Sequence, residues 1–237
     1  MEFPIDVMSN ALNPRIDGVM IGIVTNNNDP DKLGRVKLQL PLHDDQAETD
    51  WVRIATMMAG KEMGSLFIPE VGDEVLVAFH LGQIRYPIVI GMLWNNKNAP
   101  PPPAEKNDER KIVSRSGNQI LFTDKSGEET ITIKTKKGQK IVLADKDDSI
   151  TIADQSGNNE IAIKGGSANE ISIKSSSTKI VIDAKGNASI ESAKEVKIKS
   201  TQVNIEASAT MTLKSGGMLD IKSDGMINIK GSVVKIN

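Results

Sequence analysis

The chain has 237 residues and no cysteine, so disulfide bonds and thiolate metal sites are excluded. Its net charge of −2 hides a difference between residues 1–110, with 10 basic against 16 acidic side chains, and residues 111–237, with 19 against 15. The first residues lack the basic and apolar regions of a secretory signal, and no apolar run approaches the roughly 18 residues of a membrane span. We therefore expect synthesis in the cytoplasm without a signal peptide.

The first hundred residues predict short β-strands without any helical periodicity. Apolar residues alternate or cluster over residues 19–24, 35–40, 74–79 and 87–94, and turn residues such as Gly72-Asp73 separate them. Five or six strands in so short a stretch favour a small closed barrel.

Two features of this region resemble binding sites, but in each case another property of the sequence argues against binding. The polar loop 26–34 has calcium-like spacing, but it lacks the central glycine and terminal glutamate of an EF-hand loop, so it is interpreted as a turn. Trp51, Tyr86 and Trp94 could stack nucleic-acid bases, but a half-chain with an excess of acids repels a polyanion. We expect these aromatic rings to lie in the core or at an interface, and we expect no nucleic-acid partner.

Several segments between residues 16 and 96 carry a family resemblance. The strand GRVKLQLP, the turn PEVGDEV and the strand PIVIG occur in that order at similar spacings. The region resembles the OB-fold barrel of contractile-tail spikes, a family that includes phage baseplate assembly protein V and the VgrG spikes of type VI secretion. The resemblance implies an OB-fold barrel at residues 16–96, an N-terminal segment at residues 1–15, and a baseplate hub protein as the partner of the barrel.

A linker is predicted at residues 97–118, because four consecutive prolines favour an extended polyproline II conformation. The remaining residues, 119–237, repeat a pair of aliphatic residues separated by one residue. The pairs recur at intervals of roughly nine to eleven positions at first and roughly seven or eight after Ile180, and aromatic residues are absent beyond Phe122. The pairs are Ile131/Ile133, Ile141/Leu143, Ile150/Ile152, Ile161/Ile163, Ile171/Ile173, Ile180/Ile182, Ala188/Ile190, Val196/Ile198, Val203/Ile205, Met211/Leu213, Leu219/Ile221, Ile227/Ile229 and Val234/Ile236.

Such a repeat predicts a solenoid of short strands around a thin aliphatic core. Residues i and i+2 of a strand share a face, so each pair points inward, and the small polar residues between pairs turn corners. A single chain coiled into three sides and three chains wrapped round each other both fit this periodicity. The spike resemblance implies the second arrangement, an intertwined trimeric β-helix or needle at residues 119–237. The expected fold class is therefore all-β, with an OB-fold barrel followed by that needle.

The sequence predicts no catalytic, cofactor-binding or metal-binding residues, and hence no enzyme and no cofactor. His43 and His80, the two histidines, are far apart in the chain and have no neighbouring ligand, and no nucleotide, hydrolase or metalloprotease motif is present. An envelope-degrading enzyme or an adhesin built on a single-chain β-solenoid is the alternative; an enzyme's cleft would require aromatic residues that the repeat lacks.

The resemblance implies the structural central spike of a contractile injection machine, a phage tail or phage-tail-like particle, which is also released outside the cell. The spike would sit on the baseplate hub as a homotrimer and pierce the target envelope mechanically, with only transient membrane contact. Type VI spikes carry a large hub region before the barrel, and the short segment 1–15 here favours a phage tail or a related particle with a separate hub protein.

The last apolar pairs suggest a docking surface at the tip. No histidine, cysteine or acid follows Asp224, so a metal-closed tip is not expected. Ile227, Ile229, Val234 and Ile236 would form a blunt aliphatic triangle in a trimer. We expect this triangle to bind a small PAAR-type tip cap.

Overall fold

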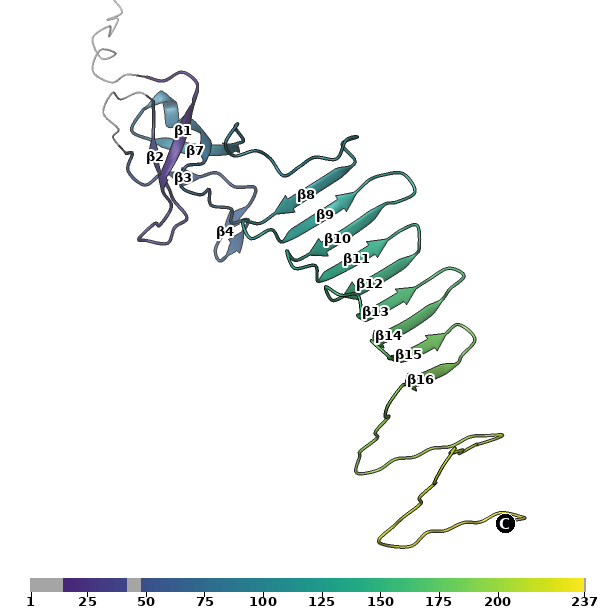
Figure 1. Ribbon diagram of the computed structural model, residues 1–237. Helices are drawn as coiled ribbons and strands as arrows, with labels where there is room; N and C mark the ends of the chain where they lie inside the picture. Colours follow the sequence, from purple (N-terminus) through teal and green to yellow (C-terminus); the bar gives the residue numbers. More distant parts are fainter. Residues whose placement is uncertain (1–14, 42–47, 237) are drawn as a thin grey trace, which may run out of the picture.

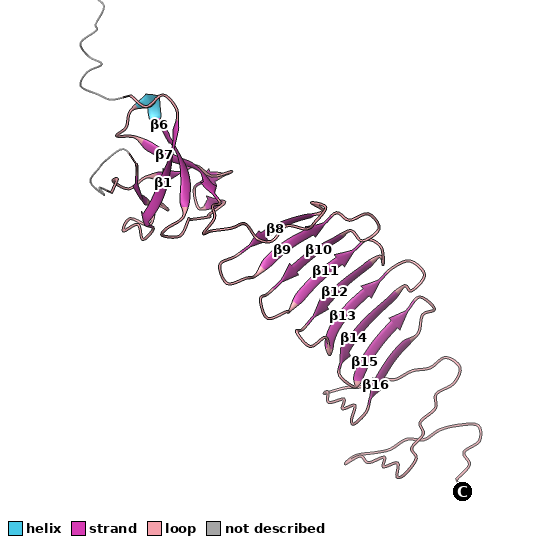
Figure 2. Ribbon diagram, turned by 45° about the horizontal axis from the view of Figure 1, so that its top comes forward, coloured by secondary structure: helices cyan, strands magenta, loops and turns pink. Residues whose placement is uncertain are grey.

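The computed structural model describes residues 15–41 and 48–236, which form strands and turns with a short 3₁₀ turn at His80–Gly82 (Figure 2). A small curled sheet comes first, a long sheet of nine strands follows, and the chain then continues as an extended zigzag (Figure 1). Within the described residues, no helix has the length and apolar character needed to cross a membrane. The predicted all-β class is confirmed.

The curled sheet has five strands in the order β2-β1-β6-β7-β3. A bridge between Val36 and Val52 connects the two ends of this order, and its two backbone hydrogen bonds of 3.0 and 2.7 Å close the barrel. A two-stranded hairpin projects from the barrel. The strands are β1 (Val19–Asn26), β2 (Lys37–Gln39), β3 (Arg53–Ile54), β6 (Glu74–Phe79) and β7 (Pro87–Leu93), and the hairpin is β4 (Ala59–Gly60) and β5 (Met63–Gly64).

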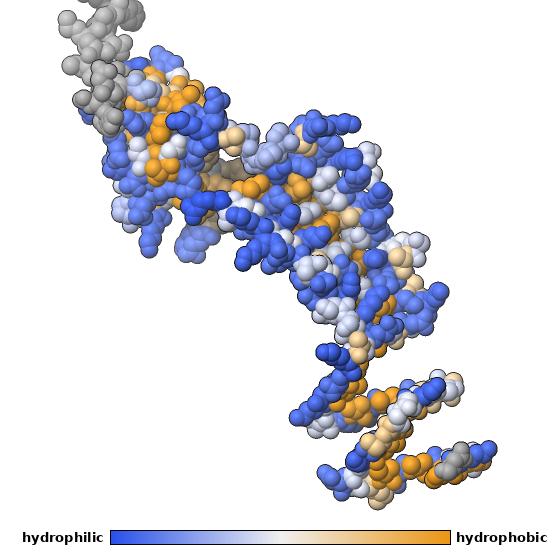
Figure 3. All heavy atoms as spheres, in the orientation of Figure 1, coloured by the Kyte–Doolittle hydropathy of each residue, from blue (hydrophilic) through white to orange (hydrophobic). Residues whose placement is uncertain are grey.

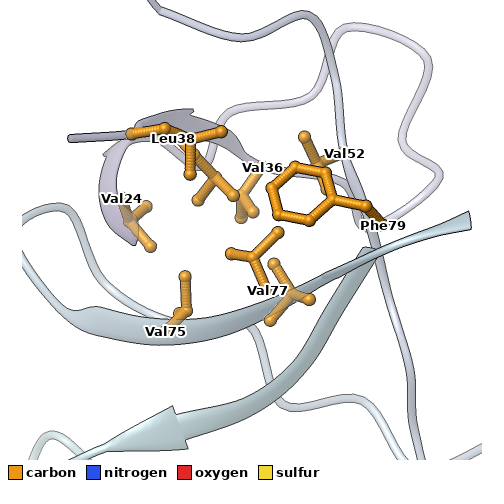
Figure 4. Close-up of a cluster of buried hydrophobic side chains, with 9 residues drawn as sticks. Val24, Val36, Leu38, Val52, Val75, Val77 and Phe79 are labelled. Atoms are coloured by element: carbon orange, nitrogen blue, oxygen red, sulfur yellow. The ribbon is translucent and has the colours of Figure 1, made fainter. Parts of the chain in front are cut away.

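The barrel core follows from strict alternation in its strands. On β6, Val75, Val77 and Phe79 are buried while the residues between them are only partly covered. These side chains meet Val24, Val36, Leu38 and Val52 from the other strands in one compact cluster (Figure 4). The alternation in the sequence therefore located four of the barrel strands correctly.

The second sheet is a meander in which each strand pairs antiparallel with the next strand of the chain. It begins at Glu109, within the segment assigned to the linker, because β8 carries one inward isoleucine, Ile112, instead of an aliphatic pair. The strands are β8 (Glu109–Val113), β9 (Gln119–Thr123), β10 (Thr130–Lys134), β11 (Lys140–Ala144), β12 (Ser149–Ala153), β13 (Asn159–Lys164), β14 (Glu170–Ser175), β15 (Thr178–Asp183) and β16 (Ala188–Ser192).

The turns explain why the chain reverses between these strands. Every turn from β8 to β16 contains at least one residue with a positive φ angle, which reversals of this kind require and which glycine adopts without steric cost. These residues are Gly117, Gly127, Gly138, Asp148, Gly157, Gly166, Asn169, Ser176 and Gly186. A short strand plus such a reversing turn accounts for the wider spacing of the aliphatic pairs up to Ile180.

Two expectations about the repeat are wrong for residues 109–192. A single-chain, three-sided coil is excluded there, because consecutive strands are antiparallel and lie in one sheet. Strands from three chains also cannot alternate along this part, since each strand is hydrogen-bonded on both sides to its own chain, with only β8 and β16 at the edges. The periodicity did not distinguish these cases, because inward pairs at i and i+2 occur in all of them.

Residues 193–236 have a different conformation. They contain no strand and no residue with a positive φ angle, although four glycines lie among them. The segment therefore continues past β16 without the reversing turns that build the meander.

Candidate assembly surface

One face of the nine-stranded sheet carries the aliphatic pairs in two continuous columns. Ile131 and Ile133 lie opposite Leu143 and Ile141 on the next strand, and the same register continues to β16. The predicted grouping of the pairs on one face is confirmed for β10–β16.

The columns begin earlier than the sequence interpretation placed them. Phe122 and Ile120 of β9 lie opposite Ile131 and Ile133, and Ile112 of β8 lies opposite Ile120. The spacing of Ile120 and Phe122 at i and i+2 in the sequence already indicated that this strand belongs to the repeat. Phe122 therefore stands at the start of one column, on the same face as the isoleucines.

The aliphatic columns are not covered by the chain's own residues. Ile133, Ile152 and Ile173 are 46–47% exposed, although they occupy the middle of a sheet. The face forms an open hollow of about 560 Å³, lined by isoleucines of β8–β12, and the space-filling view shows apolar atoms along the long sheet (Figure 3). An apolar surface that runs the length of a sheet marks an interaction site.

The opposite face of the sheet has a different composition. Its middle column consists of small and β-branched side chains, and Ala162 and Ser172 in that column are buried by their own neighbours. Lysines and acids flank the column. This face is already covered by its own long side chains, so the sheet has one face suited to water and one suited to a partner.

The extended segment lacks partners for its backbone as well as for its side chains. All residues from 193 to 236 are exposed, and no backbone hydrogen bond joins them to another segment. Open space remains between successive passes of the segment in the space-filling view (Figure 3). An isolated extended chain leaves its backbone N–H and C=O groups without partners, so this segment has free hydrogen-bonding capacity along its whole length.

The four predicted tip residues all lie in this segment. Ile227 and Val234 are half-exposed, Ile229 is 73% exposed and Ile236 is 90% exposed. A single chain does not bring them into one cluster, so their grouping into a docking triangle stays a prediction.

In the barrel, the Asp29 carboxylate organises the polar loop. The buried Asp29 carboxylate accepts hydrogen bonds from the backbone N–H groups of Asp31, Leu33 and Arg35 and from the Arg35 guanidinium, at 2.6–3.2 Å. The Arg35 contacts, with the backbone donors, hold the pKa of Asp29 far below its usual range. The predicted turn is confirmed.

The three barrel aromatics differ from one another in exposure. Trp51 is partly buried, with Arg35 and Lys37 at 6.0 and 5.6 Å from its ring centre. Tyr86 and Trp94 are 57% and 71% exposed, so a core location is wrong for these two. Their assignment to an interface stays a prediction. Each projects from a strand end or turn, where the barrel supplies no second layer to cover it.

Only one of the two histidines lies in the described part of the chain. His80 is exposed in the 3₁₀ turn, and His43 lies outside the described residues. In residues 15–41 and 48–236, no three His, Cys, Asp or Glu side chains are grouped closely enough to hold a metal ion.

An apolar hairpin on the barrel was missed by sequence reasoning. Met57, Met63, Leu66 and Phe67 lie in or beside β4 and β5 and are 61–89% exposed. The apolar run at residues 66–68 was the available signal, but a short apolar run is equally typical of a buried strand.

The comparisons with known proteins agree with this geometry. Residues 20–94 match the family described as the type VI secretion system/phage-baseplate injector OB domain. The chain is similar to type VI secretion system spike protein VgrG3 of Vibrio cholerae (32% identity over 139 residues) and to spike protein VgrG1b of Pseudomonas aeruginosa (34% over 124 residues). It is also similar to a Vibrio cholerae protein named actin cross-linking toxin VgrG1 (28% over 138 residues).

These alignments cover only part of each protein. They include 47–52% of this chain but only 13–17% of the relatives. The resemblance inferred from the sequence is confirmed, and the family match lies at residues 20–94, in the barrel.

Proposed function

Because residues 20–94 match the family of type VI secretion and phage-baseplate injector OB domains, we propose that this chain is the structural central spike of a contractile injection machine. The barrel would sit on a baseplate hub protein, and the long sheet with its extended segment would form a needle that pierces the target envelope mechanically.

The uncovered apolar face of the nine-stranded sheet is the observation that carries the proposal. Three copies related by a threefold axis would place three such faces inward, and the aliphatic columns would become the core of a prism. Two copies could pack their apolar faces against each other, but the backbone groups of residues 193–236 would then stay without hydrogen-bond partners. We therefore propose a homotrimer.

The trimer would be built in two ways along its length. Over residues 109–192 each chain supplies one complete side of the prism, because its strands already pair with each other. Over residues 193–236 the three chains would intertwine, and each pass would pair with strands of the other two. The shorter interval between aliphatic pairs after Ile180 fits this division, because a corner needs less chain than a reversal.

Mechanical piercing follows from stiffness and needs no chemistry by this chain. Strand ladders that close into a prism leave few free edges, and separating the chains requires many backbone hydrogen bonds to break together. The proposed role is therefore structural, with no reaction and no cofactor.

We further propose that a PAAR-type cap binds the end formed by Ile227, Ile229, Val234 and Ile236. Removal of the residues from Gly231 onward should then abolish binding of a purified cap while the trimer persists. Retained cap binding after this truncation would contradict the assignment.

A complementation experiment tests the spike function. Particles should assemble when the chain is intact and should lose target-cell killing when residues 193–237 are removed, because the needle is shortened while the barrel remains. A triple substitution of exposed barrel residues (Lys61→Ala, Arg85→Ala and Lys97→Ala) serves as the control. Normal killing by particles without residues 193–237 would contradict a piercing role.

A further inference from the structure

The turns of the nine-stranded sheet lie alternately along its two sides, and each of these sides is here called an edge. The two edges carry opposite charge where the needle begins. The turn between β10 and β11, with its flanking residues Lys134 to Lys140, contains four lysines and no acid. The turns on the opposite edge, residues 124–129 and 145–148, together contain six acids and two lysines. In a meander, alternate turns lie on alternate edges, so one edge is basic and the other acidic at the same level of the needle.

The lysines of the basic turn have no counter-charge in their own chain. Lys134 and Lys140 lie directly opposite each other on adjacent strands, an arrangement that is unfavourable for like charges. All four lysines are exposed, and none forms an ion pair with the residues that the structure describes. Their own sheet cannot supply the acids, because a five-residue strand of roughly 17 Å separates the two edges.

The acidic turns are only partly neutralised. Glu128 is paired with Lys125 at 2.8 Å and Asp124 with Arg110 at 2.7 Å. Asp145 and Asp147 are exposed and have no ion pair among the described side chains. An acidic edge with unpaired carboxylates thus faces away from a basic edge with unpaired lysines.

We propose that the basic turn Lys134–Lys140 of one copy lies between the two acidic turns of the next copy, and that this contact forms the seam between adjacent sides of the needle. The inference depends on the trimer proposed above and identifies its interface. A rotation axis along the needle keeps every residue at its own height in all copies. The basic turn lies one strand spacing, about 4.8 Å, from each acidic turn along the needle, so it faces the notch between them.

This seam fixes which edge of one copy meets which edge of the next copy around the needle axis. The basic edge of each copy meets the acidic edge of the next, so the contact is head-to-tail and closes into a ring. A two-copy sandwich that brings like edges together is disfavoured by repulsion. The charges therefore favour copies related by a rotation axis along the needle, while the aliphatic columns supply the core.

Zero-length cross-linking with a carbodiimide tests the contact in the unaltered protein. We expect peptides that join the lysines of residues 134–140 to acids of residues 124–129 or 145–148, in covalent dimers and trimers on a denaturing gel. The Lys125–Glu128 link, which is within one chain, is the internal control for reactivity. Finding that link without the inter-edge link would overturn the proposal.

Charge reversal gives a second, independent test on the full chain. Three variants are needed, one with a reversed basic turn, one with reversed acidic turns, and one that combines both. The substitutions are Lys136→Glu, Lys137→Glu and Lys140→Glu for the basic turn, and Glu128→Lys, Asp145→Lys and Asp147→Lys for the acidic turns.

Each single-edge reversal should lower the temperature at which the trimer dissociates in detergent by about 5 °C or more, and raising the salt to about 0.5 M should reduce this deficit. The combined variant should return to within about 2 °C of the original, because attraction is restored with the signs exchanged. Equal losses in the combined and single variants would overturn the proposal.

The outcome separates the seam from the trimer itself. If the original chain is monomeric, the proposed trimer is contradicted. If the original chain is a trimer and all three variants dissociate at the same temperature as it does, only the seam is contradicted. If the lysine variants instead lose binding to phosphatidylglycerol vesicles with no change in dissociation temperature, the basic edge faces lipid and the seam is refuted.

Discussion

Replacing Ile152 by alanine should weaken the assembly by an amount that follows from its position. Ile152 lies in an aliphatic column between Ile141 and Ile161, and 46% of it is exposed in the single chain. The substitution removes three carbons, worth about 2.4 kcal/mol if fully transferred from water. About half of that burial comes from the chain's own neighbours, so assembly accounts for about 1 kcal/mol per chain.

Three copies of Ile152 meet at one level of the proposed prism. The loss per trimer is then about 3 kcal/mol, which raises the dissociation constant roughly a hundredfold. Thr151→Ala is the matched control, because Thr151 is the adjacent residue and points to the outer face, where the expected change is less than about threefold. Sedimentation equilibrium at a fixed denaturant concentration measures both constants. Equal shifts for the two variants would refute the assignment of the aliphatic face to the interior.

Three further predictions follow from the turns, the extended segment and the barrel. Gly127→Ala should destabilise the sheet by about 1 kcal/mol in denaturant unfolding, because Gly127 has a φ of 76°, whereas Gly216→Ala, without a positive φ, should be nearly neutral. Amide hydrogens of residues 193–236 should exchange slowly in the assembled protein, and fast exchange there would contradict strand pairing between chains. The lowered pKa of Asp29 means that its stabilising effect is present above the unfolded value of about 3.9 and is lost as the pH falls below it. Unfolding midpoints of the barrel should therefore decrease below about pH 4 in the original protein and vary less with pH in Asp29→Asn; identical pH profiles would contradict this role.

The inward direction of the repeat could be predicted from the sequence, but the pairing of its strands could not. The pairs at Ile131/Ile133 and onward place apolar side chains on one face whether the chain reverses, coils or intertwines, so the pattern alone contains no information about the neighbouring strand. The glycines at positive φ, such as Gly138, were the residues that distinguish a reversal from a corner. The shorter spacing was the corresponding signal for the segment that does not reverse, although it begins one reversal early, between β15 and β16.

The barrel was predictable to a greater extent because its contacts are within one chain. Alternation located strands β1, β2, β6 and β7, and the turn predicted after Asp29 is present in the structure. Exposed residues such as Trp94 and Phe67 could not be assigned from the sequence. An apolar residue that binds another copy and one that packs in the core have the same pattern in a single sequence.

The molar mass of the intact protein in solution tests the central claim most directly. Light scattering on the purified chain should give three times the chain mass of 25.6 kDa, unchanged on dilution, because the uncovered aliphatic face and the unpaired residues 193–236 both require other copies. A mass of 25.6 kDa would contradict the needle, and twice that mass would contradict the threefold prism.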